Sequence, residues 1–257
     1  MIAVFKLDYN GKNYCGWQRQ NGQISVQQVV ETATSTLLNR KIEIVGCGRT
    51  DSGVHAKNFI CNFEIEKQDL DKLSKRALNS ILPNDIAISK IYTTEDSFHS
   101  RFDAIQRSYV YRVNIEKSVF SNELSYFAHY YNSMNFSEFE KFSSLLVNET
   151  NFRSFAKFHS NVDNYNCKLM RAEWLIKDSY NIEFHISANR FLRGMVRLIV
   201  GTYFNLGLGK ISLHQIESDI RVQNQISKAW SVPAHGLTLH EVLYPDKIIE
   251  SLVELKN

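Results

Sequence analysis

Residues 48–56, GRTDSGVHA, gather an acid, a base and two hydroxyl groups into one short loop. Asp51, Ser52 and His55 are the residue types of a serine hydrolase, and an ionised Asp51 alone could act as a nucleophile or general base. The members of a hydrolase triad normally come from separate elements, so three on one loop rarely converge. The structural interpretation is a tight turn in which the aspartate bonds local backbone N–H groups. The spacing alone favours this turn and leaves a single reactive Asp51 open.

A second group of candidates is a run of arginines in an otherwise uncharged stretch. Between residues 184 and 216 the formal charges are Arg190, Arg193, Arg197 and Lys210. Residues 189–205 are predicted to form one long helix, on which the three arginines share an arc, with Gly194 and Gly201 beside it to permit close approach. A solvated basic face is the ordinary interpretation. No acid lies four residues away to relieve the repulsion, which favours a polyanionic partner.

The third candidate is SYVYRV, residues 108–113, which has aromatic side chains at every second position of a predicted strand. Aromatics with this spacing most often pack in a core. Arginines flank them here, and rings between arginines suit base stacking together with phosphate contact. These arginines are Arg101, Arg107 and Arg112. Both interpretations stay open for this segment.

The composition is that of a globular protein with a mildly basic balance. The 257 residues carry a net charge of +3, and 44% are hydrophobic, so the chain can bury one large core or two smaller ones. This charge permits a nucleic-acid partner without requiring one. The N-terminus lacks the pattern of a signal peptide, and no apolar run approaches the about 18 residues of a membrane span. We therefore expect a soluble, cytoplasmic protein without a membrane partner.

The cysteines argue against a disulfide framework or a structural metal. The chain has four, Cys15, Cys47, Cys61 and Cys167. They lie far apart without a CxxC pair, and the histidines do not accompany them at zinc-ligand spacing. We expect no bound metal.

Hydrophobic periodicity predicts strands and helices in mixed order. Predicted strands cover residues 2–8, 42–47, 58–66, 85–92, 108–115, 171–177, 180–188 and 237–244. Predicted helices begin at Ser25, near Leu70, at Ser137, at Asn189 and at Ser212, and the three serines start capping-box patterns. Without strict alternation, this order favours an α+β fold with a largely antiparallel sheet flanked by helices. We expect two similar halves, residues 1–105 with the Asp51 loop and residues 106–257 with the aromatic segment and the arginines.

Several longer motifs, taken together, resemble one enzyme family. GRTDSGVHA is similar to the signature loop of the tRNA pseudouridine synthase A family, and FKLDYNGKNYCGWQRQ is similar to that family's opening. The stretches SVQQVVETA, FHSRFDA, RSYVYR, RFLRGMVRLIVG and AHGLTL follow in the family's order, so the resemblance covers nearly the whole chain. It implies an isomerase that converts uridine to pseudouridine at positions 38–40 in the anticodon stem-loop of tRNA. It also implies two ferredoxin-like halves around a central cleft, in a homodimer that uses neither cofactor nor metal.

By residue, the resemblance implies a catalytic aspartate, a stacking ring and an arginine partner. Asp51 is then the catalytic residue, Tyr109 stacks on the target base, and Arg197 pairs with the aspartate. Arg49 takes the position of the arginine that helps to hold the flipped-out nucleotide. Leu237 takes that of an apolar residue lining the base pocket.

Residues around these positions are expected to contact RNA. The expected contacts outside the base pocket are Arg107, Arg190 and Arg193. The chain departs from the family pattern at Phe59, where a glutamine is usual, at Gly194 and Leu198, where a His and an Asn are common, and at Ser52, where an alanine is usual. We expect these departures to fall on RNA-contacting positions.

Two alternatives from other functional classes stay open. One is an RNA-binding module that has lost catalysis, against which the presence of Asp51, Tyr109 and Arg197 argues. The other is a hydrolase built on Asp51 and His55, which lacks a third partner. We assign His55 and Ser52 to holding the shape of the loop.

Overall fold

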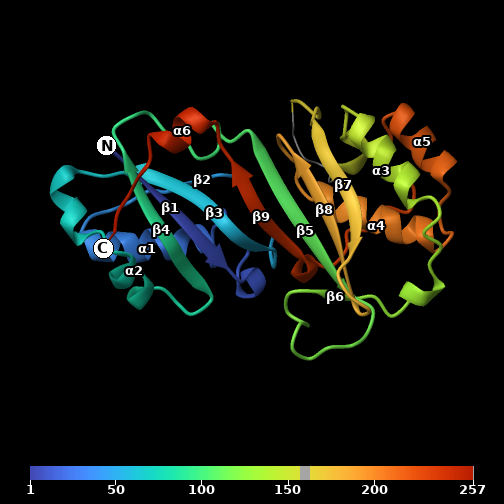
Figure 1. Ribbon diagram of the computed structural model, residues 1–257, viewed down its shortest axis with the longest axis horizontal. Helices are drawn as coiled ribbons and strands as arrows, with labels where there is room; N and C mark the ends of the chain where they lie inside the picture. Colours follow the sequence, from blue (N-terminus) through green and yellow to red (C-terminus); the bar gives the residue numbers. More distant parts are fainter. Residues whose placement is uncertain (157–162, 257) are drawn as a thin grey trace. The chain divides into compact units, whose positions relative to one another are not determined.

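The computed structural model describes residues 1–156 and 163–256, and the chain divides into two compact units. Unit 1 comprises Met1–Gln106 and Thr238–Asn257, and unit 2 comprises Arg107–Leu237. The first boundary between the units follows Gln106, one residue beyond the boundary expected from the sequence. The C-terminal segment, expected in the second half, instead belongs to unit 1, where its red ribbon runs among the blue and cyan elements of Figure 1.

Unit 1 is built on a sheet whose central strand is β1 (Ile2–Tyr9). This strand pairs antiparallel with β3 (His55–Glu64) on one side and with β4 (Ile86–Thr94) on the other. The remaining strands are β2 (Val45–Gly46) on β3, β9 (Leu237–Leu243) parallel to β3, and β10 (Val253–Glu254) on β4. The class predicted for this half, α+β with a largely antiparallel sheet, is confirmed.

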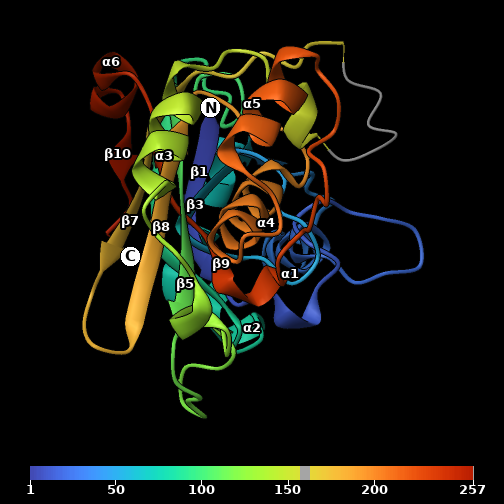
Figure 2. The same cartoon turned by 90° about the vertical axis from the view of Figure 1, so that its right-hand side faces the viewer.

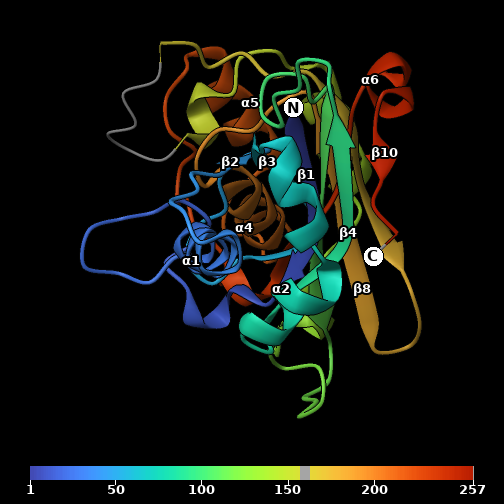
Figure 3. The same ribbon diagram turned by 90° about the vertical axis from the view of Figure 1, so that its left-hand side faces the viewer.

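The helices α1 (Val26–Leu38) and α2 (Lys75–Ile81) lie on the same side of the unit 1 sheet (Figure 3). The predicted start of α1 is confirmed, because the Ser25 hydroxyl accepts the Gln28 N–H at 3.3 Å. Near the C-terminus lies the short helix α6 (Asp246–Glu250). The 3₁₀ turn η1 (Gly11–Asn13) follows β1 directly.

Two predicted elements of unit 1 are shorter in the structure. Of the predicted strand 42–47, only β2 is paired. The single helix predicted near Leu70 is divided into the 3₁₀ helix η2 (Lys67–Lys72) and α2. The division falls at Ser74, whose extended backbone and hydroxyl cap a new helix by accepting the Ala77 N–H at 3.3 Å.

Unit 2 is built on antiparallel strand pairs. Its central strand β8 (Asn181–Ala188) pairs with β5 (Gln106–Asn114) and with β7 (Leu169–Ile176), and β6 (Tyr126–Phe127) pairs parallel to β5. The helices are α3 (Phe139–Asn148), α4 (Met195–Gly207) and α5 (Leu213–Arg221), with short 3₁₀ turns at Tyr131–Ser133, Arg153–Phe155 and Ala234–Gly236. Figure 2 shows α4 against one face of the β5–β8–β7 sheet.

The core of unit 2 is aromatic. Tyr203 on α4 is fully buried and packs against Phe142 of α3 at 4.5 Å and Phe184 of β8 at 5.1 Å between ring centroids. Trp174 of β7 packs in the same cluster, with its ring tilted and 5.1 Å from that of Phe184. Rings of this size bury large apolar areas, so this cluster holds α3 and α4 on the sheet.

The starts of two helices in unit 2 differ from the prediction. α4 begins at Met195, not near Asn189, because Gly194 at its N-cap has a φ of 72°, a left-handed conformation that ends the preceding loop. α3 begins at Phe139, with Glu138 rather than Ser137 at the cap position. The predicted arc of three arginines on one helix is therefore wrong: Arg190 and Arg193 lie in the loop before α4, and only Arg197 lies on it.

In the described parts of the chain, no helix combines the length and the apolar character needed to cross a membrane.

Candidate functional site

The loop 48–56 is fixed to the segment that follows β1 in unit 1. Thr50 accepts the Trp17 N–H through both its hydroxyl, at 3.1 Å, and its carbonyl, at 3.3 Å. The Thr50 hydroxyl also bonds the Tyr9 hydroxyl at 2.9 Å. Thr50, immediately before Asp51, is thus anchored by three hydrogen bonds, one through its backbone and two through its hydroxyl.

The backbone immediately after Asp51 is anchored to Tyr14. The Tyr14 carbonyl accepts the Ser52 hydroxyl at 3.2 Å and the Gly53 N–H at 3.3 Å. The Tyr14 ring is held in turn, because its hydroxyl donates to Asp85 at 2.5 Å. Burial, together with this carboxylate, raises the pKa of Tyr14 and keeps its hydroxyl protonated as the donor.

Asp51 lies in a turn between these two anchors. Its carbonyl accepts the Val54 N–H at 3.1 Å, and Gly53 adopts a φ of 78°, so a tight turn is present and is closed by the backbone of Asp51. The Asp51 side chain is half-buried. A carboxylate on an anchored turn and only partly shielded from solvent can meet a substrate with little loss of conformational entropy.

His55 supports the loop rather than forming a hydrolase site. Its Nδ1 accepts the Gly11 N–H at 3.0 Å, and the side chain is only 2% exposed. An accepting Nδ1 places the proton of a neutral imidazole on Nε2. The hydroxyl of Ser52 also bonds the backbone, because it donates to the Tyr14 carbonyl. The structure therefore favours the structural assignment of both residues over a hydrolase.

Two glycines that the sequence did not single out permit this close packing. A Cβ at Gly16, whose φ is 104°, would lie 2.2 Å from the Thr50 carbonyl oxygen. A Cβ at Gly11 would lie 2.0 Å from the Val54 carbonyl oxygen. Their signal in the sequence was the turn-rich stretch DYNGKNYCGW, which is uninformative until its distance from the loop is known.

Arg49 and Phe59 differ in exposure. Arg49 is exposed, and its Nε donates to the Gln18 side-chain oxygen at 3.1 Å. Phe59 is fully buried on β3 and stacks on Trp17 with ring centroids 4.1 Å apart. The expectation that Phe59 marks an RNA-contacting position is therefore wrong, because its side chain belongs to the core of unit 1. Leu198, 8% exposed, is likewise buried.

In unit 2 the two tyrosines of SYVYRV have different surroundings, although the sequence left both a core role and a base-stacking role open for this segment. Tyr111 is fully buried and donates its hydroxyl to the Pro233 carbonyl at 3.0 Å, which makes it a core residue. Tyr109 is half-buried, and its ring meets Phe191 edge-on at 5.2 Å. Of the two rings, only that of Tyr109 keeps part of its surface exposed. Sequence reasoning missed Phe191, whose only signal was its place among the arginines.

Arg197 lies in the first turn of α4, half-buried. Its Nε donates to the Val232 carbonyl at 2.6 Å. Burial lowers the pKa of His235 below its ordinary value of 6.5, and the Arg197 guanidinium lowers it further. Leu237, two residues on from His235, is 5% exposed. Within unit 2, Arg197 therefore lies near Val232 and His235, which shortly precede the predicted pocket residue Leu237.

The remaining arginines have different surroundings. Arg107 donates to the Asn189 carbonyl at 2.8 Å and so ties β5 to the loop before α4. Arg193 is exposed and Arg190 half-buried in that loop. Arg112 forms an ion pair with Glu183 at 3.1 Å, so it does not supply the unneutralised charge expected from the sequence.

No group of three or more metal-ligating side chains gathers anywhere in residues 1–156 or 163–256.

Comparison with known proteins identifies the family. The family model described as tRNA pseudouridine synthase matches residues 7–103 and 144–245. The chain belongs to this family. A protein of Bacteroides fragilis named tRNA pseudouridine synthase A is 39% identical over 246 residues, which cover 95% of this chain and 96% of the relative. Proteins of the same name from Azobacteroides pseudotrichonymphae and Colwellia psychrerythraea are 41% and 32% identical, over 95% and 96% of this chain and 97% and 95% of the relatives.

The matched segments include most of the residues predicted to act in the tRNA pseudouridine synthase reaction. The first contains the anchored loop with Asp51 and Arg49, and the second contains Arg197 and Leu237. Tyr109 lies between the two segments but within the length shared with the relatives of the same name, which covers nearly the whole chain.

Proposed function

We propose that this protein isomerises uridine to pseudouridine at positions 38–40 in the anticodon stem-loop of tRNA, with Asp51 as the catalytic carboxylate. The observation that carries the proposal is the Asp51 turn, anchored on both sides by Thr50 and Ser52 in a chain of the tRNA pseudouridine synthase family. An anchored turn is what a carboxylate needs to reach one reacting atom repeatedly.

The reaction breaks the N1–C1′ glycosidic bond, turns the uracil, and joins C5 to C1′. The hydrogen on C5 leaves as a proton and N1 gains one, so the base is isomerised without a change in composition. The carboxylate must be ionised whether it attacks C1′, attacks C6 or removes the C2′ proton. The base must also leave its stack first, which costs a few kcal/mol.

The other proposed site residues offset the cost of unstacking the base and stabilise the negative charge of Asp51. Tyr109 offers the stacking plane, which is worth about 1–3 kcal/mol per base. Leu237 lines the apolar side of the base pocket, and Arg49 contacts the phosphates beside the extruded nucleotide. Arg197 pairs with Asp51, since a guanidinium stays charged when it is desolvated and favours an ionised carboxylate beneath the base.

The proposal is tested with tRNA tritiated at uridine C5. The wild-type protein should release tritium to water and form pseudouridine. Asp51→Asn keeps the size of the side chain and should bind tRNA, because phosphate contacts do not need the carboxylate, yet release no tritium. Tyr109→Phe, which keeps the ring, is the matched control and should still turn over. Tritium release by Asp51→Asn, with deamidation excluded by mass, would contradict the proposal, and tRNA binding without turnover by the wild type would indicate an RNA-binding module.

The proposal extends to the assembly and its surroundings. We expect a homodimer that acts in the cytoplasm, where tRNA is modified, and that uses no cofactor or metal. Sedimentation equilibrium should return twice the mass of one chain, and treatment with EDTA should leave tritium release unchanged. A monomeric mass for the active protein would contradict the homodimer and leave the reaction itself unaffected.

A further inference from the structure

Gln18 occupies a short segment of unit 1 whose backbone is held at both ends. On one side the Trp17 N–H bonds Thr50 twice, and the Trp17 ring is 2% exposed. A Cβ at Gly46 would lie 2.4 Å from the Trp17 indole nitrogen, so this ring fills a space that only a glycine leaves open. The backbone preceding Gln18 is therefore fixed to the Asp51 loop.

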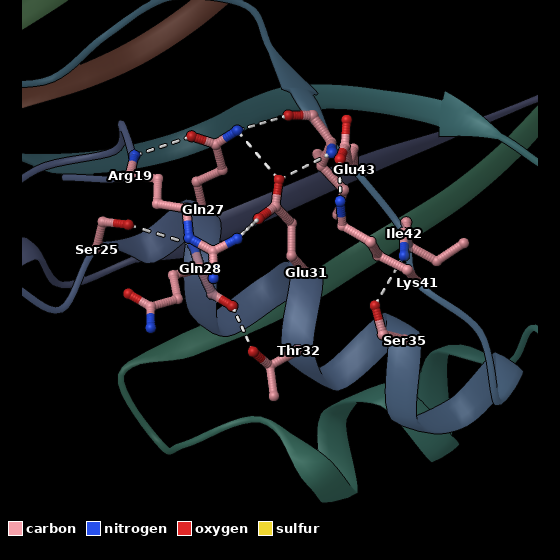
Figure 4. Close-up of polar contacts among 11 residues, drawn as sticks. Arg19, Ser25, Gln27, Gln28, Glu31, Thr32, Ser35, Lys41, Ile42 and Glu43 are labelled. Carbon is pink, nitrogen blue, oxygen red and sulfur yellow. Dashed lines mark hydrogen bonds and ion pairs between the residues drawn. The ribbon is translucent and has the colours of Figure 1, made fainter. Parts of the chain in front are cut away.

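On the other side the segment is fixed to α1 through Arg19. The Arg19 N–H donates to the Gln27 side-chain oxygen at 3.0 Å, and the Arg19 guanidinium pairs with Glu31 at 3.3 Å. Gln27 also donates to Glu31, at 3.1 Å (Figure 4). Glu31 accepts the Ile44 N–H at 3.0 Å. Glu31 is 7% exposed. Such a buried carboxylate network is costly to rearrange, so it keeps Arg19 and the backbone of Gln18 in place.

Arg19 and Arg49 have different partners in this arrangement, one charged and one neutral. Arg19 pairs with a carboxylate, which neutralises its charge. Arg49 bonds the side-chain oxygen of Gln18 through Nε at 3.1 Å. An amide oxygen orients a guanidinium without cancelling its charge. The bond uses Nε and not the two terminal amino groups, which can bind a phosphate together.

We propose that Gln18 is a positioning residue for tRNA modification, which holds the Arg49 guanidinium in the orientation that meets an RNA phosphate. The proposal rests on the proposed function, because Arg49 is there the residue beside the extruded nucleotide. A free arginine side chain samples many rotamers, and ordering it costs entropy when RNA binds. The hydrogen bond to Gln18 orders the Arg49 side chain before the RNA binds, so this entropy is not lost on binding. Its neutral amide keeps the full positive charge for the phosphate.

The test combines Gln18 variants with Arg49→Ala in the full-length protein and unmodified tRNA. Gln18→Ala should lower the efficiency of pseudouridine formation about tenfold, the scale of one hydrogen bond to a charged group. In the Arg49→Ala background the same change should have no further effect, because its target is gone. Gln18→Glu keeps the acceptor but adds a negative charge, so it should reduce the salt dependence of tRNA affinity by about one phosphate contact.

The matched control is Gln20→Ala, which removes the same type of side chain from the same loop, where that side chain donates to the Cys15 carbonyl at 3.3 Å. It should leave efficiency and salt dependence unchanged. Equal losses from Gln18→Ala with and without Arg49 would overturn the proposal, as would an equal loss from Gln20→Ala.

A readout without turnover separates this proposal from the proposed function. In protein labelled with ¹⁵N-arginine, the Arg49 Nε–H signal should be protected from exchange in the wild type and lose that protection in Gln18→Ala. If the wild type forms no pseudouridine, the proposed function fails while this signal still reports on the orientation of Arg49. An Nε–H signal that Gln18→Ala leaves unchanged would overturn the positioning role whatever the activity.

Discussion

Arg197 and Val232 hold each other through two hydrogen bonds that run in opposite directions. The Arg197 Nε donates to the Val232 carbonyl at 2.6 Å, and the Val232 N–H donates to the Arg197 carbonyl at 3.3 Å. The second bond fixes the backbone of the Val232 segment to α4, and the first fixes the guanidinium to that segment. The direction of the Arg197 side chain is therefore set within unit 2 before any substrate binds.

Arg197→Met should cut the turnover of bound tRNA by about 10²–10³-fold, the scale of losing one aligned charged group from a reaction site. Binding of tRNA should stay near normal. Arg197→Lys should recover little, because an ammonium cannot bond Val232 and a carboxylate through separate edges as a guanidinium can. Single-turnover rates and a separate binding titration distinguish the two effects. Weakened affinity with intact turnover of bound tRNA would make Arg197 a phosphate contact.

Gly201→Ala should destabilise unit 2 by about 1–3 kcal/mol, the usual cost of forcing extra volume into a packed site. A Cβ at Gly201 would lie 1.8 Å from the Trp230 carbonyl oxygen, so α4 and the segment before Val232 would have to separate. Urea unfolding measures the change. Gly48→Ala is the control, since a Cβ there would meet no described atom within 4 Å. Equal stability of the two variants would show that the segment around Trp230 can move away from α4 without lowering the free energy of unfolding.

The stability of unit 2 should fall as the pH drops below about 6.5, the pKa of a histidine in the unfolded chain, at which half of it is charged. Burial lowers the pKa of His235 in the folded protein, so below that pH the unfolded state binds more protons and gains stability relative to the folded state. His235→Gln should reduce the difference between urea midpoints at about pH 7.5 and about pH 5.5. The exposed His214→Gln should retain it. A His235→Gln variant with the full pH difference would place the titrating group elsewhere.

Arg190 and Arg193 should contribute to tRNA affinity through contacts with phosphates. Changing both to Gln should flatten the slope of log K against log salt by about 0.7–0.9 for each phosphate that is no longer neutralised. Arg171→Gln is the matched control, because Arg171 is already paired with Glu173 on the same strand. A slope unchanged in the double variant would show that these two arginines do not meet RNA.

The elements that could be predicted from the sequence are those whose signals are local. The cap at Ser25 and the strands β5 and β8 depend on neighbours within a few residues, so they appear where the pattern predicts them. The start of α4 was missed because Gly194 looked like one small residue on a helix face, whereas its left-handed backbone ends the loop. The family resemblance located Asp51, since the motif itself is contiguous in the chain.

The surroundings of that motif follow from packing in three dimensions. Phe59 is a core residue because Trp17, which lies in a different segment of the chain, stacks on it. Gly11 and Gly16 are necessary because the loop's carbonyl oxygens approach them, and Gln18 is the partner of Arg49 because two anchored segments meet. Each is a contact between residues distant in sequence. Periodicity and composition report on neighbours along the chain, and packing selects neighbours in space.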